Sequence, residues 1–147
     1  MYCYKYPHPA ITADCVVFAH EGTSLYVLLI ERGQDPYKGH WAFPGGFMNM
    51  DETVEECALR ELEEETGLIL NDMEQLRTFS KVDRDPRERV LTVAFLAILT
   101  RRAEVKGSDD ARQAQWWDIN ELPPLAFDHQ EILTCALQRL NGKSPLP

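Results

Sequence analysis

The amino-acid sequence predicts an α/β fold, in which a mixed β-sheet carries helices. Two observations support this prediction. Runs of β-branched and apolar residues recur along the chain between turn residues, as strands do. The segments with this character are 10–19, 25–31, 41–43, 75–82, 89–100 and 115–118. Two further segments repeat apolar residues at helical spacing, 53–66 and 128–140, and would cover the sheet.

The short segments between these elements predict how the chain turns. The residues at 21–24 have turn chemistry, so the first two strands form a β-hairpin. The third strand stops at 44–46, Pro-Gly-Gly, because proline removes a ladder donor and glycine permits a sharp turn. The polar segment 101–111 predicts a loop, and the aromatic, proline-rich residues 1–9 predict an extended N-terminal arm.

The segment 53–66 carries the clearest helix signals. Thr53 is followed three residues later by Glu56, which is the capping-box pattern. Gly67 lies just beyond the end, where a left-handed cap requires it. An apolar face consists of Val54, Cys57, Ala58 and Leu62. The segment therefore predicts a helix with one face in the core.

The opposite face of this helix is unusually acidic. Glu61 lies beside both Glu64 and Glu65, because residues three and four apart are neighbours on a helix. Like charges so placed repel, and Arg60 is the nearby basic residue. Hard divalent cations with oxygen ligands would offset this repulsion. The cluster therefore predicts a magnesium site that handles a phosphate compound.

Length and composition fit a single domain over 1–147, with 44% of residues hydrophobic and 27% charged. The formal net charge of -9 argues against nucleic acid or an anionic membrane as a partner. No secretory signal and no apolar run of membrane-spanning length is visible, which favours a cytoplasmic protein. The four cysteines lack metal-site spacing and are expected to be buried, reduced thiols.

The acidic helix and the residues before it resemble the Nudix box. That motif is a glycine, five residues, a glutamate, seven residues, and then Arg-Glu-apolar-x-Glu-Glu-x-Gly-apolar. Every fixed position is filled here, by Gly46, Glu52, Arg60, Glu61, Leu62, Glu64, Glu65, Gly67 and Leu68. The order of strands on either side is also similar. The resemblance implies a Nudix-type α/β/α sandwich with a mixed β-sheet, and hydrolysis of a nucleoside diphosphate linked to another moiety.

The resemblance also implies roles for residues of the box. The implied metal ligands are Glu52, Glu61, Glu64 and Glu65. Magnesium is the expected metal, with manganese as an alternative. Catalysis would depend on Glu64, Glu61 and Arg60, the arginine pairing with a box glutamate to fix its rotamer. Gly45 and Gly46 would let the backbone approach metal and phosphate closely.

The position of the general base stays open. In several Nudix hydrolases it lies outside the box, on a loop near the end of the sheet. The acidic loop residues here are Glu88, Glu104, Asp109 and Asp110. A glutamate of the box is the other candidate. A base must reach the attacking water within hydrogen-bond distance, and sequence does not define that distance.

Two segments, 83–89 and 126–132, are similar to ADP-ribose pyrophosphatase-like Nudix proteins. They imply that Arg84 and Arg87 bind a phosphate or ribose hydroxyls, which suit the guanidinium fork. Arg32, beside a predicted strand end, is a third candidate for phosphate. Alternatively, the arginines at 83–89 pair with acidic residues of the same segment and stabilise a turn. Several aromatic side chains could stack a purine or belong to the core instead: Trp41, Phe43, Phe47, Phe127 and His129.

The sequence therefore predicts a magnesium-dependent hydrolase that cleaves ADP-ribose or a related nucleotide sugar into AMP and a sugar phosphate. Two alternatives stay open: a nucleoside triphosphate pyrophosphatase, and a sensor that binds an ADP-ribose-type ligand without cleaving it. DNA binding is not expected, because the chain is acidic, keeps its box whole and ends at Pro147 without a winged-helix domain. A homodimer is a further expectation, since many similar proteins are dimers.

Overall fold

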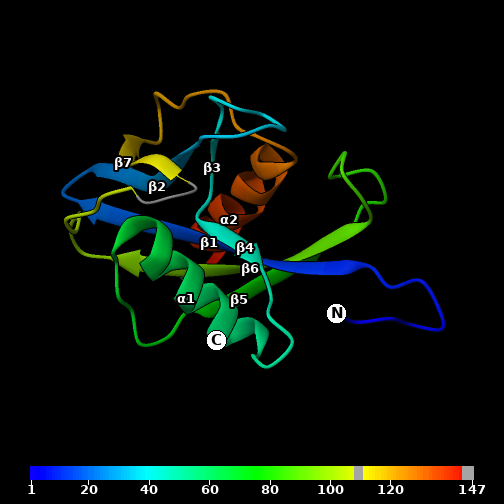
Figure 1. The fold of residues 1–147 in the computed structure, drawn as a ribbon. Helices are drawn as coiled ribbons and strands as arrows, with labels where there is room; N and C mark the ends of the chain where they lie inside the picture. Colours follow the sequence, from blue (N-terminus) through cyan, green and yellow to red (C-terminus); the bar gives the residue numbers. More distant parts are fainter. Residues whose placement is uncertain (108–110, 144–147) are drawn as a thin grey trace.

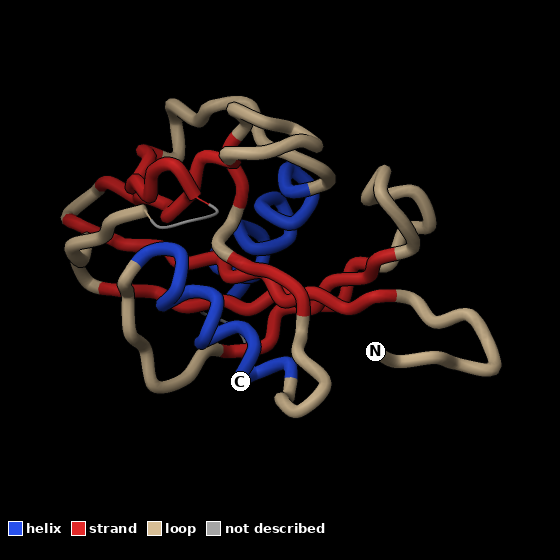
Figure 2. Tube along the Cα trace, viewed as in Figure 1, coloured by secondary structure: helices blue, strands red, loops and turns tan. Residues whose placement is uncertain are grey.

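A computed structural model describes residues 1–107 and 111–143 of the chain (Figures 1 and 2). Apart from β4, the elements follow one another in the order that the sequence predicts. The elements are β1 (Ala10–Glu21), β2 (Ser24–Arg32), β3 (Trp41–Ala42), β4 (Gly45–Phe47), α1 (Val54–Thr66), β5 (Glu74–Phe79), β6 (Val90–Leu99), β7 (Ala111–Asp118) and α2 (His129–Lys143).

The described strands form one seven-stranded sheet. Its main path runs β3-β2-β1-β6-β5, with β4 paired to β1 and β7 paired to β2 beside that path. β1 and β6 are parallel, in register from Ala10–Val90 to Ala19–Leu99. The remaining strand pairs are antiparallel. The predicted mixed sheet is therefore confirmed, and its parallel central pair explains why β1 and β6 are apolar on both sides.

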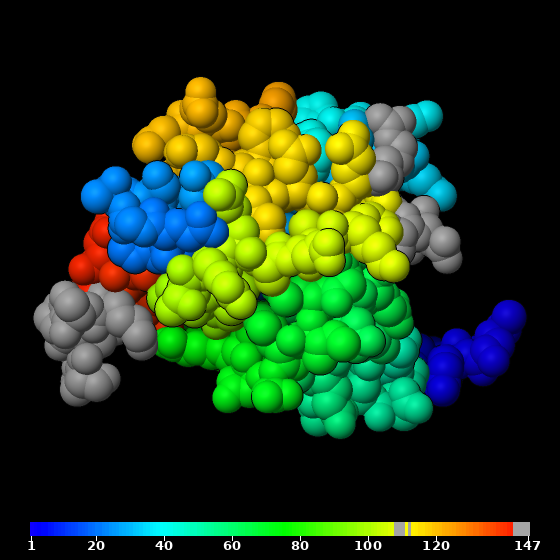
Figure 3. Space-filling view, turned by 90° about the vertical axis from the view of Figure 1, so that its left-hand side faces the viewer, coloured from blue at the N-terminus to red at the C-terminus, as the bar shows by residue number. Residues whose placement is uncertain are grey.

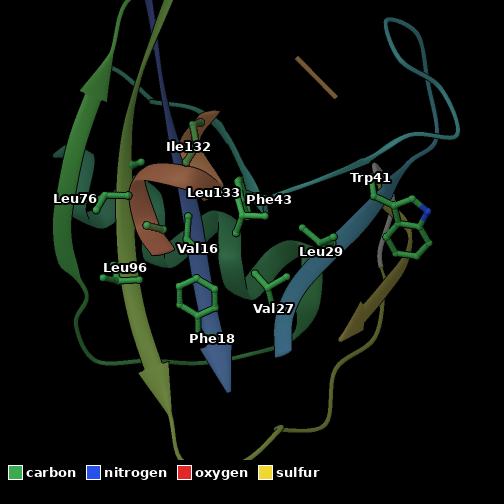
Figure 4. Packing of buried hydrophobic residues seen from close by; sticks show 12 residues of the cluster. Val16, Phe18, Val27, Leu29, Trp41, Phe43, Leu76, Leu96, Ile132 and Leu133 are labelled. Carbon is green, nitrogen blue, oxygen red and sulfur yellow. The ribbon is translucent and has the colours of Figure 1, made fainter. Parts of the chain in front are cut away.

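Successive side chains of β1 enter two cores, one on each face of the sheet. Val16 and Phe18 pack on the same side as Ile132 and Leu133 of α2 (Figure 4). The other core combines Ala13, Cys15 and Val17 of β1 with Cys57, Ala58 and Leu62 of α1. The two helices therefore cover opposite faces of the sheet (Figure 1), which is the predicted α/β/α sandwich.

Helix α1 begins and ends as its sequence predicts. The Thr53 hydroxyl accepts from the Glu56 N–H at 3.1 Å, and the Glu56 carboxylate accepts from the Thr53 N–H at 2.8 Å. Gly67 adopts a left-handed φ of 78°, and its N–H donates to the Glu63 carbonyl. These caps define the helix ends, and burial of Leu62 sets which face meets the sheet.

The structure corrects the prediction of a turn at Gly45 and Gly46. These residues begin β4, whose three residues pair antiparallel with Thr12–Asp14 of β1. A Cβ on Gly45 would overlap the Ala13 carbonyl, and a Cβ on Gly46 would overlap the Glu61 carboxylate. The two glycines are therefore needed so that a strand can pass between β1 and α1.

The structure also corrects the boundaries at 101–111 and 115–118. β7 begins at Ala111 and pairs with β2 from Arg32–Ala111 to Tyr26–Asp118. Pairing along a whole neighbouring strand extends β7 through polar residues that do not favour strand by themselves. At the opposite edge of the sheet, the strand predicted at 75–82 is shorter: β5 ends at Phe79.

Residues 1–9 are exposed and form neither helix nor strand. Cys3 is exposed there, so the expectation of a buried thiol is wrong for this residue. Cys15 and Cys57 are buried between β1 and α1, and burial raises the pKa of Cys57 to about 12. No helix within 1–107 and 111–143 has the length and apolar character needed to cross a membrane.

Replacing Thr53 by alanine should lower the free energy of unfolding by about 1 kcal/mol, because the Glu56 N–H loses its cap acceptor. Thr53→Ser keeps a hydroxyl and should stay close to the wild type. Urea unfolding followed by circular dichroism measures both variants. Equal stability of Thr53→Ala and wild type would contradict the cap assignment.

Candidate active site

Arg60 is the centre of the acidic cluster on α1. Its Nε and Nη2 donate to the two oxygens of Glu52 at 2.9 and 2.7 Å. Its Nη1 donates to Glu61 at 3.0 Å and to Glu64 at 3.2 Å, and Nη2 also donates to the Phe47 carbonyl. One guanidinium therefore holds three carboxylates of the box and the end of β4 together.

This arrangement changes the ionisation of its members. The hydrogen bonds from Arg60 hold the pKa of Glu52 at about 2, and Glu52 raises the pKa of Arg60 above its ordinary value. Both groups therefore stay charged at neutral pH. Removing Arg60 would leave neighbouring carboxylates facing one another without a cation.

The fourth box carboxylate, Glu65, is tied to β4 rather than to Arg60. It is buried, and its Oε1 accepts from the Gly45 N–H at 2.8 Å. On the next residue, Gly46, the absent side chain leaves room for the Glu61 carboxylate. The two glycines of β4 thus bring its backbone against two carboxylates of α1, while the predicted approach to metal and phosphate stays a prediction.

A cleft of about 360 Å³ opens beside these residues. Its wall on the α1 side includes Arg60, Glu61 and Glu65. The remaining wall comes from β1, the segments that follow β2 and β3, the 80–89 loop and the start of α2. These residues include Thr12, Asp14, Arg32, Gly45, Gly46, Phe47, Arg84, Asp85, Arg87, Phe127 and His129. Of the predicted metal ligands, Glu61 and Glu65 line the cleft, whereas Glu52 and Glu64 do not.

The donor set fits a hard divalent cation, because carboxylate oxygens crowd one end of the cleft beside a backbone without side chains. In the part of the chain that the structure describes, no three acidic, histidine or cysteine side chains already converge on one point. The hydrogen bonds to Arg60 and to the Gly45 N–H hold the carboxylates instead. The side chain of Glu64 is 58% exposed, and its bond to Arg60 is the longest of those to the box carboxylates, at 3.2 Å.

Two of the four loop candidates for a general base are described, and both are outside this cleft. Glu88 and Glu104 are exposed and do not line it. Glu104 belongs to the segment 101–107 (yellow-green in Figure 3), which runs between α1 and β7. The Lys106 N–H donates there to the Thr66 carbonyl at 2.9 Å. Asp109 and Asp110, the remaining candidates, lie outside the described residues.

Arg32, Arg87 and Phe127 form a cationic patch on another wall of the cleft. The guanidinium groups of Arg32 and Arg87 lie 5.0 and 5.6 Å from the centre of the Phe127 ring. Burial and the charge of Arg87 lower the pKa of Arg32, which remains a cation. Phe127 has a φ of 52°, a conformation that costs energy for a bulky residue and often marks a binding site.

Arg84 and Arg87 have different partners, although the sequence groups them. Arg84 is buried and donates twice to Asp128, at 2.9 and 2.7 Å. Burial alone would lower the pKa of Arg84, but the bonds and charge of Asp128 raise it overall. Arg87 pairs with Asp85 within its own loop, as the turn alternative predicts, and stays more exposed.

The aromatic candidates divide between core and cleft. Trp41 is buried against Trp117, and Phe43 is buried against the imidazole of His129. Both belong to the core, as the alternative interpretation holds. Phe47 is 39% exposed and lies beneath the guanidinium of Arg87, so it joins Phe127 at the rim of the cleft.

Asp14 is a cleft residue that the sequence analysis did not single out. It lies in the middle of an apolar strand, is 7% exposed, and its Oδ2 accepts from the Thr92 hydroxyl at 2.6 Å. His129, at the start of α2, lies with its Nε2 3.8 Å from the same oxygen. The signal available in the sequence was the charged residue itself, inside a strand that is otherwise buried on both faces.

Comparison with known proteins identifies the class. The NUDIX domain family model matches residues 8–135, which is most of the chain. The chain therefore belongs to the Nudix family. The fold and the enzyme class that the sequence predicts, a Nudix pyrophosphohydrolase, are both confirmed at this level.

Two relatives that are similar to this chain are named for ADP-ribose. The ADP-ribose pyrophosphatase of Methanocaldococcus jannaschii is 42% identical over 137 residues, which covers 93% of this chain and 78% of that protein. The ADPR responsive transcriptional repressor NtrR of Acinetobacter baylyi is 34% identical over 143 residues, 95% of this chain. The chain spans only 57% of that repressor's length.

A solved structure is also similar to this chain over most of its length. The NUDIX domain of Shewanella oneidensis NrtR, in a cocrystal structure with ADP ribose, superposes with a TM-score of 0.86 at 32% identity. The match covers 92% of this chain and 90% of that chain. The shared fold therefore extends over both walls of the cleft.

Replacing Arg60 by methionine should destabilise the protein most at neutral pH. The depressed pKa of Glu52 means that its pairing stabilises the fold above its ordinary pKa of 4.5 and is lost as pH falls toward about 2. The gap in unfolding free energy between wild type and Arg60→Met should therefore shrink over that interval. Urea unfolding at a series of pH values measures it.

The control for this experiment is Arg101→Met, because Arg101 is exposed and outside the cluster. It should leave stability nearly unchanged at every pH. A gap for Arg60→Met that stays constant from pH 7 to pH 2.5 would show that Arg60 does not act through these carboxylates.

Proposed function

We propose that the protein hydrolyses the pyrophosphate bond of ADP-ribose or a related nucleotide sugar, using Mg²⁺, to give AMP and a sugar phosphate. One observation carries this proposal: a single cleft places the carboxylates of α1 opposite a cationic and aromatic patch. A nucleoside diphosphate derivative has the matching parts, namely a charged bridge and a purine ring.

The carboxylates of α1 would hold the metal near the bridge. Bound Mg²⁺ supplies positive charge to the phosphate oxygens and acidifies a bound water. Glu61 and Glu65 already line the cleft, and Glu64 is exposed enough to join them. Glu52 would keep Arg60 in place, and Arg60 would keep the remaining carboxylates close enough to share cations. Mn²⁺ offers the same preference for oxygen ligands.

The opposite wall would bind the substrate's own charge and its base. Arg32 has no ion-pair partner among the described residues, so a phosphate could approach it without displacing a carboxylate. Arg87 lies between Phe47 and Phe127 and can contact both a phosphate and a stacked ring. Arg84, by contrast, would hold the loop through Asp128 and act on substrate only indirectly.

We place the general base within the Nudix box. Glu88 and Glu104 do not line the cleft, whereas Glu61 and Glu64 lie on one turn of α1 and share the Arg60 guanidinium. A base on this turn would meet a water held between metal and phosphorus. Glu64 fits this role through its exposure, and Glu61 through its position on the cleft wall.

Binding without hydrolysis is the second candidate function. It is favoured by the hydrogen bonds that hold Glu52, Glu61 and Glu64 to Arg60 and Glu65 to the Gly45 N–H. The similarity to a repressor described as ADPR responsive points the same way. In a sensor the cationic wall would bind ADP-ribose, while the carboxylates would stay engaged.

Product analysis distinguishes these functions. Purified protein with ADP-ribose and Mg²⁺ should release AMP and ribose 5-phosphate, and EDTA should abolish turnover. Release of pyrophosphate from nucleoside triphosphates, with ADP-ribose untouched, would instead identify a triphosphate pyrophosphatase. Tight calorimetric binding of ADP-ribose without products, across Mg²⁺ and Mn²⁺, would identify a sensor.

Removing one box carboxylate should abolish most activity while leaving the fold intact. Glu61→Gln, Glu64→Gln and Glu65→Gln should each lower kcat by at least about 100-fold, since even outer partners of a metal cost about 10- to 100-fold. Relief of like-charge repulsion should keep their melting temperatures near the wild-type value. Glu63→Gln is the matched control, because Glu63 is exposed on the same helix outside the motif. Full activity in the three variants would refute the metal assignment.

Arg87 and Arg84 should differ in what their removal affects. Arg87→Ala should raise the KM for ADP-ribose and change stability little, because its pair with Asp85 is partly exposed. Arg84→Met should lower the free energy of unfolding by roughly 3–5 kcal/mol, because it leaves a buried Asp128 carboxylate unpaired. Steady-state kinetics and urea unfolding on both variants test this division. An Arg84→Met variant with altered kinetics but wild-type stability would contradict this division of roles.

A further inference from the structure

Asp14 and His129 form a polar pair on the cleft wall that faces away from α1. Val16 and Phe18 follow Asp14 on the same face of β1 and pack against α2. Three glutamates of the Nudix box, Glu61, Glu64 and Glu65, belong to α1 on the opposite face of the sheet. Both sets of side chains line one cleft, separated by the backbone of β4. The Asp14–His129 pair is therefore a second polar site within the same cleft.

Hydrogen bonds define which atoms of this pair are donors and acceptors. His129 Nδ1 accepts from the Phe43 N–H at 3.1 Å, so the neutral imidazole carries its proton on Nε2. The Asp14 carboxylate uses Oδ2 for the Thr92 hydroxyl. Oδ1 receives no hydrogen bond from a described residue, and it lies 2.5 Å from where a Cβ on Gly45 would stand. The pair thus presents one N–H donor and one carboxylate acceptor.

The spacing of the pair leaves one atom of each group, His129 Nε2 and Asp14 Oδ1, without a hydrogen bond to a described residue. Nε2 and Oδ2 are 3.8 Å apart, which is too far for a direct hydrogen bond. Among the described side-chain atoms sealed from solvent, only the Trp117 indole nitrogen lacks a partner. His129 Nε2 and Asp14 Oδ1 therefore still reach the open volume of the cleft. Because Nε2 and Oδ2 are 3.8 Å apart, an oxygen beside both can lie at about 2.8 Å from the Nε2–H donor and from the Asp14 carboxylate.

We propose that Asp14 and His129 bind a sugar hydroxyl of the substrate, which donates to the Asp14 carboxylate and accepts from His129 Nε2–H. A hydroxyl is the group that both donates and accepts at one atom. A phosphate oxygen would accept from His129 but would be repelled by Asp14. This inference rests on the proposed function for the identity of the substrate, and it makes Asp14 a determinant of specificity for the sugar.

The edge of an adenine also combines a donor and an acceptor, so its position decides between the two sources. Phe47 is exposed, and Phe127 has a left-handed φ. Both rings lie near the Arg87 guanidinium at the rim of the cleft, where a purine ring could stack on them. Asp14 lies beside Gly45, whose N–H binds the box glutamate Glu65. A sugar attached directly to the diphosphate is the part of the substrate that stays this close to the metal ligands.

The test combines Asp14→Asn with substrates that lack single groups. The series is ADP-ribose, its 2′-deoxy analogue, ADP esterified to a five-carbon alkyl alcohol in place of the terminal ribose, and the hypoxanthine analogue. Asp14→Asn should lower kcat/KM for ADP-ribose by about 10- to 100-fold. For one of the two sugar-modified substrates the same substitution should change kcat/KM little, because the hydroxyl in question is already missing. Asp72→Asn, an exposed aspartate before β5, is the matched control.

His129→Asn provides a second variant if Asp14→Asn unfolds. Its amide oxygen can still accept from the Phe43 N–H, while the Nε2–H donor is removed, so it should show the same dependence on the sugar hydroxyl. Equal losses on all substrates would overturn the proposal and leave both residues with a structural role. Loss of sensitivity only to the hypoxanthine analogue would also overturn it, in favour of the base.

The same variants keep the inference distinct from the proposed function. If the wild type does not cleave ADP-ribose, the proposed hydrolysis fails. Calorimetric affinities of ADP-ribose and the two sugar-modified analogues for wild type, Asp14→Asn and His129→Asn then apply the same test. If the loss of affinity from the substitution and the loss from the missing hydroxyl simply add, the residue does not bind that hydroxyl and the inference is overturned. This outcome does not depend on whether the protein hydrolyses ADP-ribose.

Discussion

The mutual repulsion of the carboxylates on α1, and its relief by Arg60, is the constraint on which the site depends. Glu61, Glu64 and Glu65 on α1, with Glu52 just before it, would push one another outward if they had no cation. Arg60 draws three of them together and also binds the Phe47 carbonyl. The same guanidinium thus connects the acidic helix to β4. The acidic cluster and the strand beside the cleft therefore form one unit.

This unit can form only because β4 contains glycines, which have no side chains at the two close contacts. Gly46 makes room for the Glu61 carboxylate on one side, and Gly45 leaves space for Asp14 on the other. The cleft consequently receives side chains from both faces of one sheet, with only a backbone between them. A ligand that lies along β4 can meet carboxylates of α1 at one end and the Asp14–His129 pair, with its N–H donor and carboxylate acceptor, at the other. This division matches a molecule with a charged bridge and a sugar.

The sequence predicted those parts of the site that depend on local chemistry. The caps of α1, its buried face and its acidic face all follow from residues close together in the chain. The extent of β7 and the strand at Gly45–Phe47 did not, because both depend on pairing with distant strands. Nor could the sequence separate Arg84 from Arg87. Their partners differ because Asp128, far along the chain, reaches only the first.

The two walls of the cleft also explain how relatives named for cleaving ADP-ribose and for responding to it can share one fold. Recognition of the sugar and base would depend on residues opposite α1, whereas cleavage also needs the box carboxylates to turn from Arg60 and the Gly45 N–H towards cations. Loss of that rearrangement would leave binding intact. In this chain all the carboxylates are present, and Glu64 is largely exposed. The intact box therefore favours hydrolysis over sensing.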